Sequence, residues 1–124
     1  MSTLKVGTIQ DTSAGSSSTP AQIEQGRAKV WVNLQGDGTA AIRDSFNVSS
    51  ITDNGTGNYT VTFSNAMSND DYCCLVTTRR HAGVTETTGS INAALSTGSA
   101  IVQSVTLSGS AADTQTMCVA IFGD

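Results

Sequence analysis

Arg79, Arg80 and His81 are the residues of this chain whose types most suggest chemistry with a ligand. His81 is the only histidine, and a nucleophilic triad would need it to orient a serine and to be oriented itself by a carboxylate. The residues around it, 79–83, have the composition of a polar turn, so we expect no triad and no enzyme. A solvent-exposed loop with no binding role is enough to explain why these polar residues occur here. The alternative is recognition of an anionic or sugar ligand by the planar donors of arginine.

Three cysteines, Cys73, Cys74 and Cys118, are the residues that could bind a metal or form a disulfide. Cys73 and Cys74 are adjacent, so on a strand their side chains would point to opposite faces, which argues against a shared metal ion. The N-terminus lacks the apolar core of a signal peptide, and this favours three small, buried, reduced thiols. The alternative is a disulfide from Cys118 to either Cys73 or Cys74.

Carboxylates cluster at Asp70-Asp71 and, with an amide, at Asp53-Asn54. Loops rich in such oxygens can bind Ca²⁺, but the spacing here matches no EF-hand loop. Capping of turns is the simpler role for these side chains. The sequence therefore predicts no metal site and no cofactor.

Trp31 is the largest side chain that could serve as a recognition surface. It shares a predicted strand face with Lys29 and Asn33. An exposed tryptophan there would be a stacking platform for a sugar or an anchor in a subunit interface. The other interpretation is that a sandwich buries both faces of this strand and that Trp31 belongs to the core.

Composition excludes several classes of partner. The formal net charge is -4, and the six basic residues are scattered, so no basic face is expected for nucleic acid. No apolar run approaches the roughly 20 residues of a membrane span, so we expect no membrane insertion. Serine and threonine together number 34, with 12 glycines and a single proline. This composition is typical of strands joined by tight turns.

Strands are indicated where apolar residues alternate with polar ones. Residues 30–34 place valines and a leucine on one face, and residues 59–63 do the same with aromatic residues and a valine. Residues 53–57, Asp-Asn-Gly-Thr-Gly, contain the strongest hairpin signal of the chain, because Asn-Gly suits turns with positive φ. In residues 40–48, Ile42 and Phe46 are expected inward, although Asp44 then falls on the same face unless a bulge shifts the register.

The second half of the chain gives further strands of different character. Residues 72–78 have a continuous apolar middle, which predicts a central strand covered on both faces. Residues 84–88 and 91–95 are expected as short edge strands or as a hairpin around Gly89. Residues 100–108 and 117–122 complete the set. No segment has a helical apolar period, so an all-β fold is predicted: an antiparallel β-sandwich or jelly roll of about seven to nine short strands.

Residues 1–25 differ from the sandwich domain expected over residues 26–124. They contain a short alternating run, Leu4, Val6 and Ile9, followed by a flexible tract rich in serine. Burial of these few aliphatic side chains cannot offset the entropy lost by ordering so many residues. We therefore expect an extended N-terminal arm that either is disordered alone or becomes ordered against another subunit or partner, with Leu4, Val6 and Ile9 as the attachment residues.

About half of the chain resembles small structural proteins of marine tailed bacteriophages, many of which are described as tail fibre proteins. The residues that show this are STLKVGTIQDTS, GRAKVWVN, AIRDSFNVSSITDNGTGNYTVTFSNAM and the terminal CVAIFGD. Residues 44–67 are the most specific part, and residues 73–116 are not diagnostic.

The resemblance implies a non-enzymatic virion protein, assembled in the host cytoplasm, with other virion proteins and copies of itself as partners. A tail-fibre or capsid-fibre module would be a homotrimer that docks through its arm and presents the β domain to a host cell-surface glycan. Arg79, Arg80, His81 and Trp31 are then the candidate recognition residues. The alternative is a capsid decoration protein that covers or reinforces the shell without binding a receptor.

Overall fold

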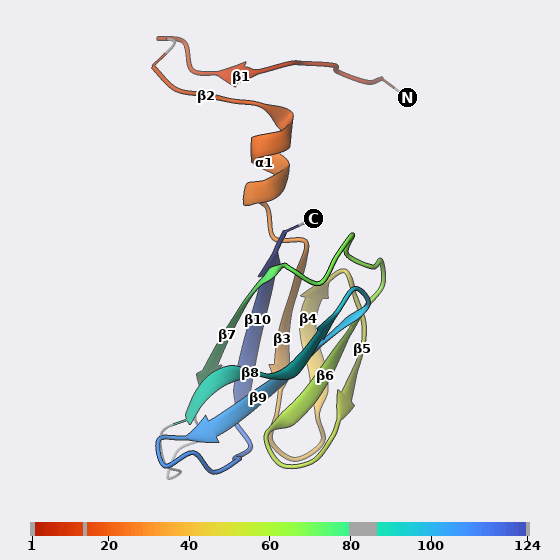
Figure 1. The fold of residues 1–124 in the computed structure, drawn as a ribbon, viewed down its shortest axis with the longest axis vertical. Helices are drawn as coiled ribbons and strands as arrows, with labels where there is room; N and C mark the ends of the chain where they lie inside the picture. Colours follow the sequence, from red (N-terminus) through yellow and green to blue (C-terminus); the bar gives the residue numbers. More distant parts are fainter. Residues whose placement is uncertain (1, 14, 80–86, 124) are drawn as a thin grey trace.

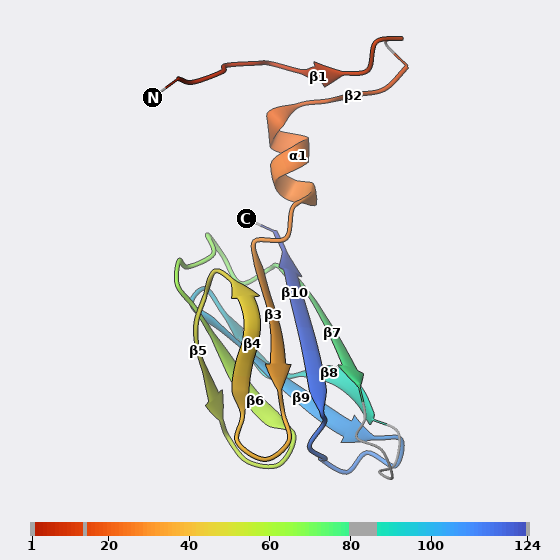
Figure 2. The same ribbon diagram turned by 180° about the vertical axis from the view of Figure 1, so that it is seen from behind.

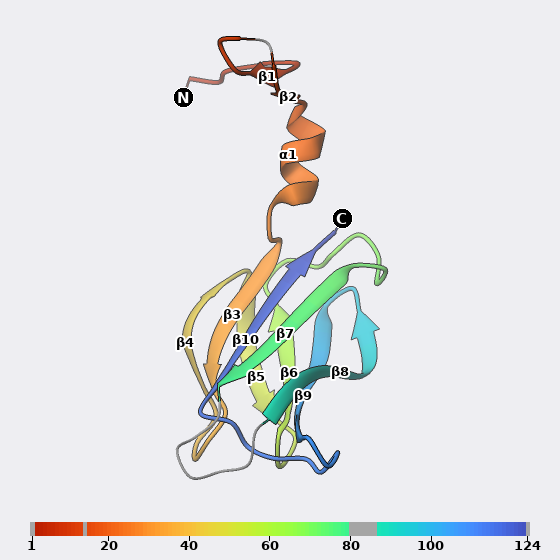
Figure 3. The ribbon, with the colours of Figure 1, turned by 90° about the vertical axis from the view of Figure 1, so that its left-hand side faces the viewer.

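Two four-stranded antiparallel sheets pack face to face in the computed structural model, which describes residues 2–13, 15–79 and 87–123, without the side chains of residues 91–94. The β10 sheet has the order β4 (Ala41–Phe46), β3 (Val30–Gln35), β10 (Thr116–Phe122), β7 (Cys73–Arg79). The β9 sheet has the order β5 (Val48–Asp53), β6 (Asn58–Phe63), β9 (Ser99–Thr106), β8 (Thr87–Ser96). Figure 3 shows the two layers. The predicted all-β antiparallel sandwich is confirmed.

The core lies between the two sheets and comes mainly from four strands. The alternation predicted for residues 30–34 and 59–63 is confirmed, because the inward side chains of β3 and β6 are almost completely buried. β9 and β10, which take the central positions beside them, contribute the facing side chains. The fully buried core includes Val30, Val32, Leu34, Tyr59, Val61, Ala100, Val102, Met117 and Ile121.

The prediction for residues 40–48 is wrong about which face Phe46 occupies. The register between β3 and β4 shifts after Asn33, which pairs with Asp44, so that Leu34 pairs with Ile42. This bulge shifts the alternation, as Asp44 suggested it could. Phe46 consequently pairs with Trp31 and is 47% exposed, and Ile42, at the sheet edge, is also exposed.

Residues 72–78 do not form a central strand. β7 is an edge strand of the β10 sheet, and β10 lies between it and β3. Cys73 and Leu75 are exposed, whereas Cys74 and Val76 are half-buried toward the core. The continuous apolar run therefore has one face against the core and the other on the surface. The hairpin expected around Gly89 is also absent from the described residues, because β8 passes through Gly89 as one strand.

A short helix, α1 (Pro20–Gly26), joins the N-terminal arm to the sandwich, and the sequence pattern did not predict it. Its signal is a capping box. The Thr19 side chain accepts a hydrogen bond from the Gln22 amide at 3.2 Å, and the Gln22 side chain accepts one from the Thr19 amide at 2.8 Å. Pro20 stands in the first turn, where its missing N–H has no cost. Seven residues are too few to show an amphipathic period.

The arm stands beyond one end of the sandwich, the end at which the chain also terminates (Figures 1 and 2). Within it β1 (Ile9–Gln10) pairs with β2 (Ser17–Ser18), and Asp11 accepts a hydrogen bond from the Gly15 amide at 2.8 Å across the turn. No helix in the described part of the chain is long and apolar enough to cross a membrane.

Candidate functional site

A row of apolar side chains crosses the outer face of the β10 sheet. Phe46 on β4 pairs with Trp31 on β3, Trp31 pairs with Ala120 on β10, and Ala120 pairs with Leu75 on β7. Phe46, Trp31 and Leu75 are 47%, 36% and 53% exposed. Large apolar side chains grouped on one surface are typical of a protein interaction site rather than of a plain solvated face.

A groove of about 330 Å³ runs along β10 between two of these side chains. Its floor consists of the small residues Ala120 and Cys118. Its walls are Trp31 and Asn33 on β3, and Leu75 and Thr77 on β7, which the strand registers place on either side. We refer to this feature as the β10 groove.

Arg43 lies near the Thr116 end of β10, beyond the residues that line the β10 groove. Its guanidinium donates to the Thr116 hydroxyl at 2.5 Å and to the Gln115 carbonyl at 3.0 Å. The opposite end, toward Phe122, faces the side of the sandwich from which α1 and the arm emerge (Figure 1).

Trp31 lies on the surface, so the interpretation that it belongs to the core is wrong.

Arg79 ends β7, and its carbonyl accepts a hydrogen bond from the Thr114 hydroxyl at 2.6 Å. Arg80 and His81 lie outside the described residues, as does most of the loop that was considered for recognition. β7 ends, at Arg79, at the end of the sandwich opposite α1 (Figure 1), and Arg79 lies on the same exposed face of β7 as Leu75, four residues further along.

The attachment residues of the arm are all on its surface. Leu4 is 86% exposed, Val6 42% and Ile9 54%. Ile23 on α1 is likewise exposed, and α1 has no buried residue. The arm therefore has apolar side chains that its own chain leaves in solvent.

The strand register excludes both disulfides that were considered. Cys118 pairs with Thr77, four residues along β7 from Cys73, which corresponds to about 13 Å. Cys74 faces the opposite side of that strand. All three cysteines are free, but the expectation that all three are buried is wrong, because Cys73 and Cys118 are exposed and only Cys74 is half-buried.

We predict that thiol alkylation distinguishes Cys74 from the other two cysteines. Burial raises the pKa of the Cys74 thiol to about 11, so its reactive thiolate is about a hundredfold scarcer at pH 8 than for an ordinary thiol. Mass spectrometry after brief treatment with iodoacetamide should show Cys73 and Cys118 modified and Cys74 protected until urea is added. Equal labelling of all three in the native protein would contradict this placement of β7.

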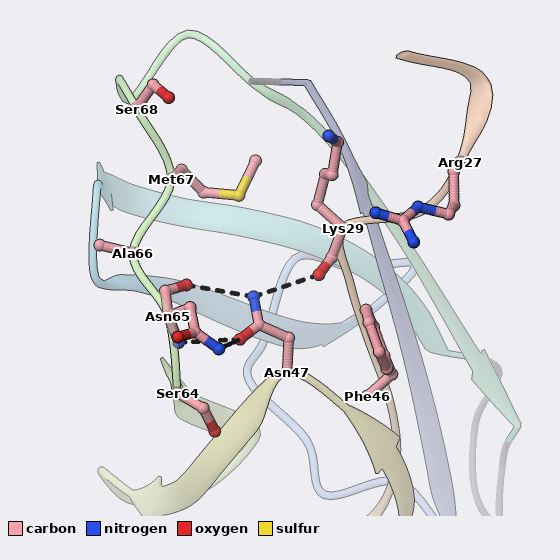
Figure 4. A pocket seen from close by; sticks show the side chains of 9 residues that line it. All are labelled: Arg27, Lys29, Phe46, Asn47, Ser64, Asn65, Ala66, Met67 and Ser68. Carbon is pink, nitrogen blue, oxygen red and sulfur yellow. Dashed lines mark hydrogen bonds between the residues drawn. The ribbon is translucent and has the colours of Figure 1, made fainter. Parts of the chain in front are cut away.

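A second cavity, of about 490 Å³, lies where α1 joins the sandwich (Figure 4). The two cationic side chains at its mouth are engaged by one carboxylate, because Arg27 and Lys29 contact Glu24 at 2.7 and 2.5 Å. Hydrogen bonds from Lys29 and then Arg27 lower the pKa of Glu24. Exposed ion pairs of this kind contribute little to stability. The cavity is better described as the junction that orients α1 than as a ligand site.

Asn47 organises the wall of this junction cavity. Its side-chain amide donates to the Lys29 and Asn65 carbonyls at 3.2 and 3.1 Å, and its oxygen accepts from the Asn65 amide at 2.8 Å (Figure 4). Asn47 has a φ of 57° and lies between β4 and β5, where the chain passes from one sheet to the other. It therefore fixes both the corner of the sandwich and the start of β3.

The opposite end of the sandwich is held by a buried tyrosine. The Tyr59 hydroxyl donates to the Gly36 carbonyl at 2.5 Å and lies 3.2 Å from Asp113 Oδ1, which also accepts from the Gly57 amide at 2.7 Å. Burial, and secondarily the charge of Asp113, raises the pKa of Tyr59. These hydrogen bonds join the turn after β3, the turn before β6 and the segment before β10. No group of three or more His, Cys, Asp or Glu side chains that could bind a metal occurs among the residues described.

The β10 groove could not be identified from sequence alone, although Trp31 was. Leu75, Cys118 and Ala120 lie in strands with apolar residues on both faces. The local sequence does not show whether the outer face of such a strand is exposed or covered by another element. No protein-family model, no curated protein and no solved structure matches the chain.

Proposed function

We propose that this chain is a non-enzymatic structural protein of a phage virion, docked through its N-terminal arm and presenting its β-sandwich outward. The observation behind this proposal is the contrast between a rigid sandwich and an arm whose apolar side chains are all exposed. An arm with Leu4, Val6 and Ile9 in solvent gains stability when another surface covers those side chains. The resemblance to small phage structural proteins supports the virion as the place of docking.

The position of the arm indicates which end of the sandwich would point away from the particle. α1 and the arm leave one end of the sandwich, and Arg79 lies at the other (Figure 1). A module attached by its arm would turn the Arg79 end away from the particle. This orientation suits a tail-fibre or capsid-fibre module, in which that end meets a host cell-surface glycan.

A capsid decoration protein is the second candidate function. The exposed apolar row on the β10 sheet supports it, because a decoration protein covers neighbouring subunits and needs lateral contacts. Quantitative mass spectrometry of purified particles separates the two roles. Hundreds of copies per particle would favour decoration, and tens or fewer would favour a fibre.

Deletion of residues 1–25 should leave the sandwich folded but abolish incorporation into particles. α1 has no buried residue, so the midpoint of urea unfolding should change little. The measurement is the amount of truncated protein that sediments with particles assembled in an infected host, with the full chain as the control. Full incorporation of a folded truncation would refute docking through the arm.

A further inference from the structure

We infer that Asn54 is a site of self-modification, at which the backbone nitrogen of Gly55 attacks the Asn54 side chain and converts it to aspartate or isoaspartate. Asn54 is the one asparagine of the sequence that precedes a glycine. It lies in the turn between β5 and β6, where residues 53–56 are all exposed. The reaction needs only this turn and water, and it does not depend on the proposed function.

Gly55 leaves space around the nitrogen that must attack. It has no side chain, and a Cβ atom at this position would meet nothing within 4 Å, so the turn is open on this side. Every other asparagine precedes a residue with a side chain, whose Cβ crowds the ring that the reaction has to form. The turn therefore combines an exposed side-chain amide with an unobstructed neighbouring nitrogen.

The Asp53 carboxylate lies on the proton that must leave. The Gly55 amide donates to Asp53 Oδ1 at 2.9 Å. A backbone amide is a poor nucleophile until it loses this proton, and a carboxylate within hydrogen-bond distance is a general base for it. Asp53 pairs with Tyr59 at the end of β5, so the sheet fixes its backbone. The fold thus holds a base against the reacting nitrogen, which an unfolded chain does only transiently.

The nitrogen that must leave also has a suitable neighbour. Asn54 Nδ2 donates to the Thr60 hydroxyl at 2.8 Å. A hydroxyl both accepts and donates, so Thr60 can pass a proton to this nitrogen when it departs.

The atoms of the reaction balance without any oxidant or reductant. The Gly55 nitrogen gives its proton to Asp53 and bonds to Cγ of Asn54. The tetrahedral carbon then expels the side-chain nitrogen, which regains that proton through Thr60 and leaves as ammonia, so that a succinimide ring remains. Water adds to either carbonyl of the ring and breaks one carbon–nitrogen bond. One break gives aspartate, and the other gives isoaspartate, in which the backbone runs through the former side chain.

Isoaspartate at position 54 changes the turn itself. It lengthens the backbone by one carbon between two hydrogen bonds, from the Asn54 amide to the Asn58 carbonyl and from the Asn58 amide to the Gly55 carbonyl, both at 2.9 Å. It also places a second negative charge beside Asp53. The turn lies at the end of the sandwich opposite α1 (Figure 1), so the modification loosens the end that the arm does not occupy.

Mass spectrometry of the aged full-length protein tests the site. After incubation at neutral pH and physiological temperature, fragment spectra should show an amide replaced by a carboxyl group at Asn54. Conversion there should be at least tenfold faster than at Asn69, which is also exposed but precedes Asp70. Conversion at Asn54 that is no faster than at Asn69 would overturn the inference.

Asp53→Asn tests the role of the fold. Asparagine keeps an acceptor for the Gly55 amide but is not a base, so conversion of Asn54 in the folded protein should slow at least fivefold. In urea, where the turn is absent, the same substitution should change the rate less than twofold. Asp71→Asn makes the same change of charge in another exposed turn and should have no effect. An unchanged rate in folded Asp53→Asn, or an equal slowing in urea, would contradict base catalysis by Asp53.

The stability of the product tests its effect on the turn. Ion exchange separates the isoaspartyl form by its extra charge, and this form should unfold at a lower urea concentration than fresh protein. An isoaspartyl form as stable as fresh protein would contradict loosening of this end of the sandwich.

Discussion

Replacement of Gly57 by alanine is expected to lower the free energy of unfolding by about 3 to 5 kcal/mol. Gly57 has a φ of 64°, and a Cβ atom there would lie 2.5 Å from the Ser104 carbonyl oxygen and 2.6 Å from that of Ala112. Both contacts are with backbone, so no side chain can rotate to relieve them. Because a domain of this size is stabilised by only about 5 to 15 kcal/mol, the loss would be a large fraction of the total.

The effect is large because three segments meet at Gly57. Its carbonyl accepts a hydrogen bond from the Ser104 amide of β9 at 2.7 Å, and its own amide donates to Asp113 at 2.7 Å. Asp113 in turn lies beside the Tyr59 hydroxyl. Displacement of the backbone at Gly57 would therefore disturb the start of β6, the middle of β9 and the loop before β10 together.

Gly38→Ala is the matched control. Gly38 has nearly the same φ, 65°, but a Cβ atom there meets nothing within 4 Å. It should cost about 1 to 2 kcal/mol, the penalty of the left-handed conformation alone. Urea unfolding followed by circular dichroism gives both values. Similar losses for the two variants would show that close backbone approach at Gly57 is not the cause.

The local sequence pattern correctly predicted those strands in which apolar residues alternate strictly with polar ones. In residues 59–63 every apolar residue points inward, so alternation and burial agree, and the glycines at 55 and 57 supply the positive φ angles of the preceding hairpin. The capping box of α1, formed by Thr19 and Gln22, is also recognisable from the sequence. These features depend on neighbours a few residues away.

The surface that matters most for the proposed assembly depends on strand order, which local pattern does not contain. The apolar run at residues 73–76 is compatible with a central strand or with an edge strand that has an exposed apolar face. Only the placement of β10 between β3 and β7 brings Leu75, Ala120 and Trp31 into one row. Likewise, a single bulge in β4 moved Phe46 to the surface; Asp44 indicated that a bulge was possible, but not where the register would shift.

Asn47→Ala is expected to lower the free energy of unfolding by about 3 kcal/mol. Alanine would keep the unfavourable φ of 57° and lose every hydrogen bond of the amide, to Lys29 and to Asn65. The carbonyl of Lys29, which is partly buried at the start of the sandwich, would lose a donor, and so would that of Asn65. Urea unfolding of the full chain, monitored by circular dichroism, measures the loss.

Asn47→Gly separates the two causes, because glycine adopts this φ without strain but also lacks the amide. It should be more stable than the alanine variant by about 1 kcal/mol and still less stable than the wild type. If the glycine variant were as unstable as the alanine variant, backbone strain at the corner would have no part in the loss. If the glycine variant were as stable as the wild type, the hydrogen bonds of Asn47 to Lys29 and Asn65 would contribute nothing to stability. Asn47 would then not be the residue that holds the start of β3 against the sandwich.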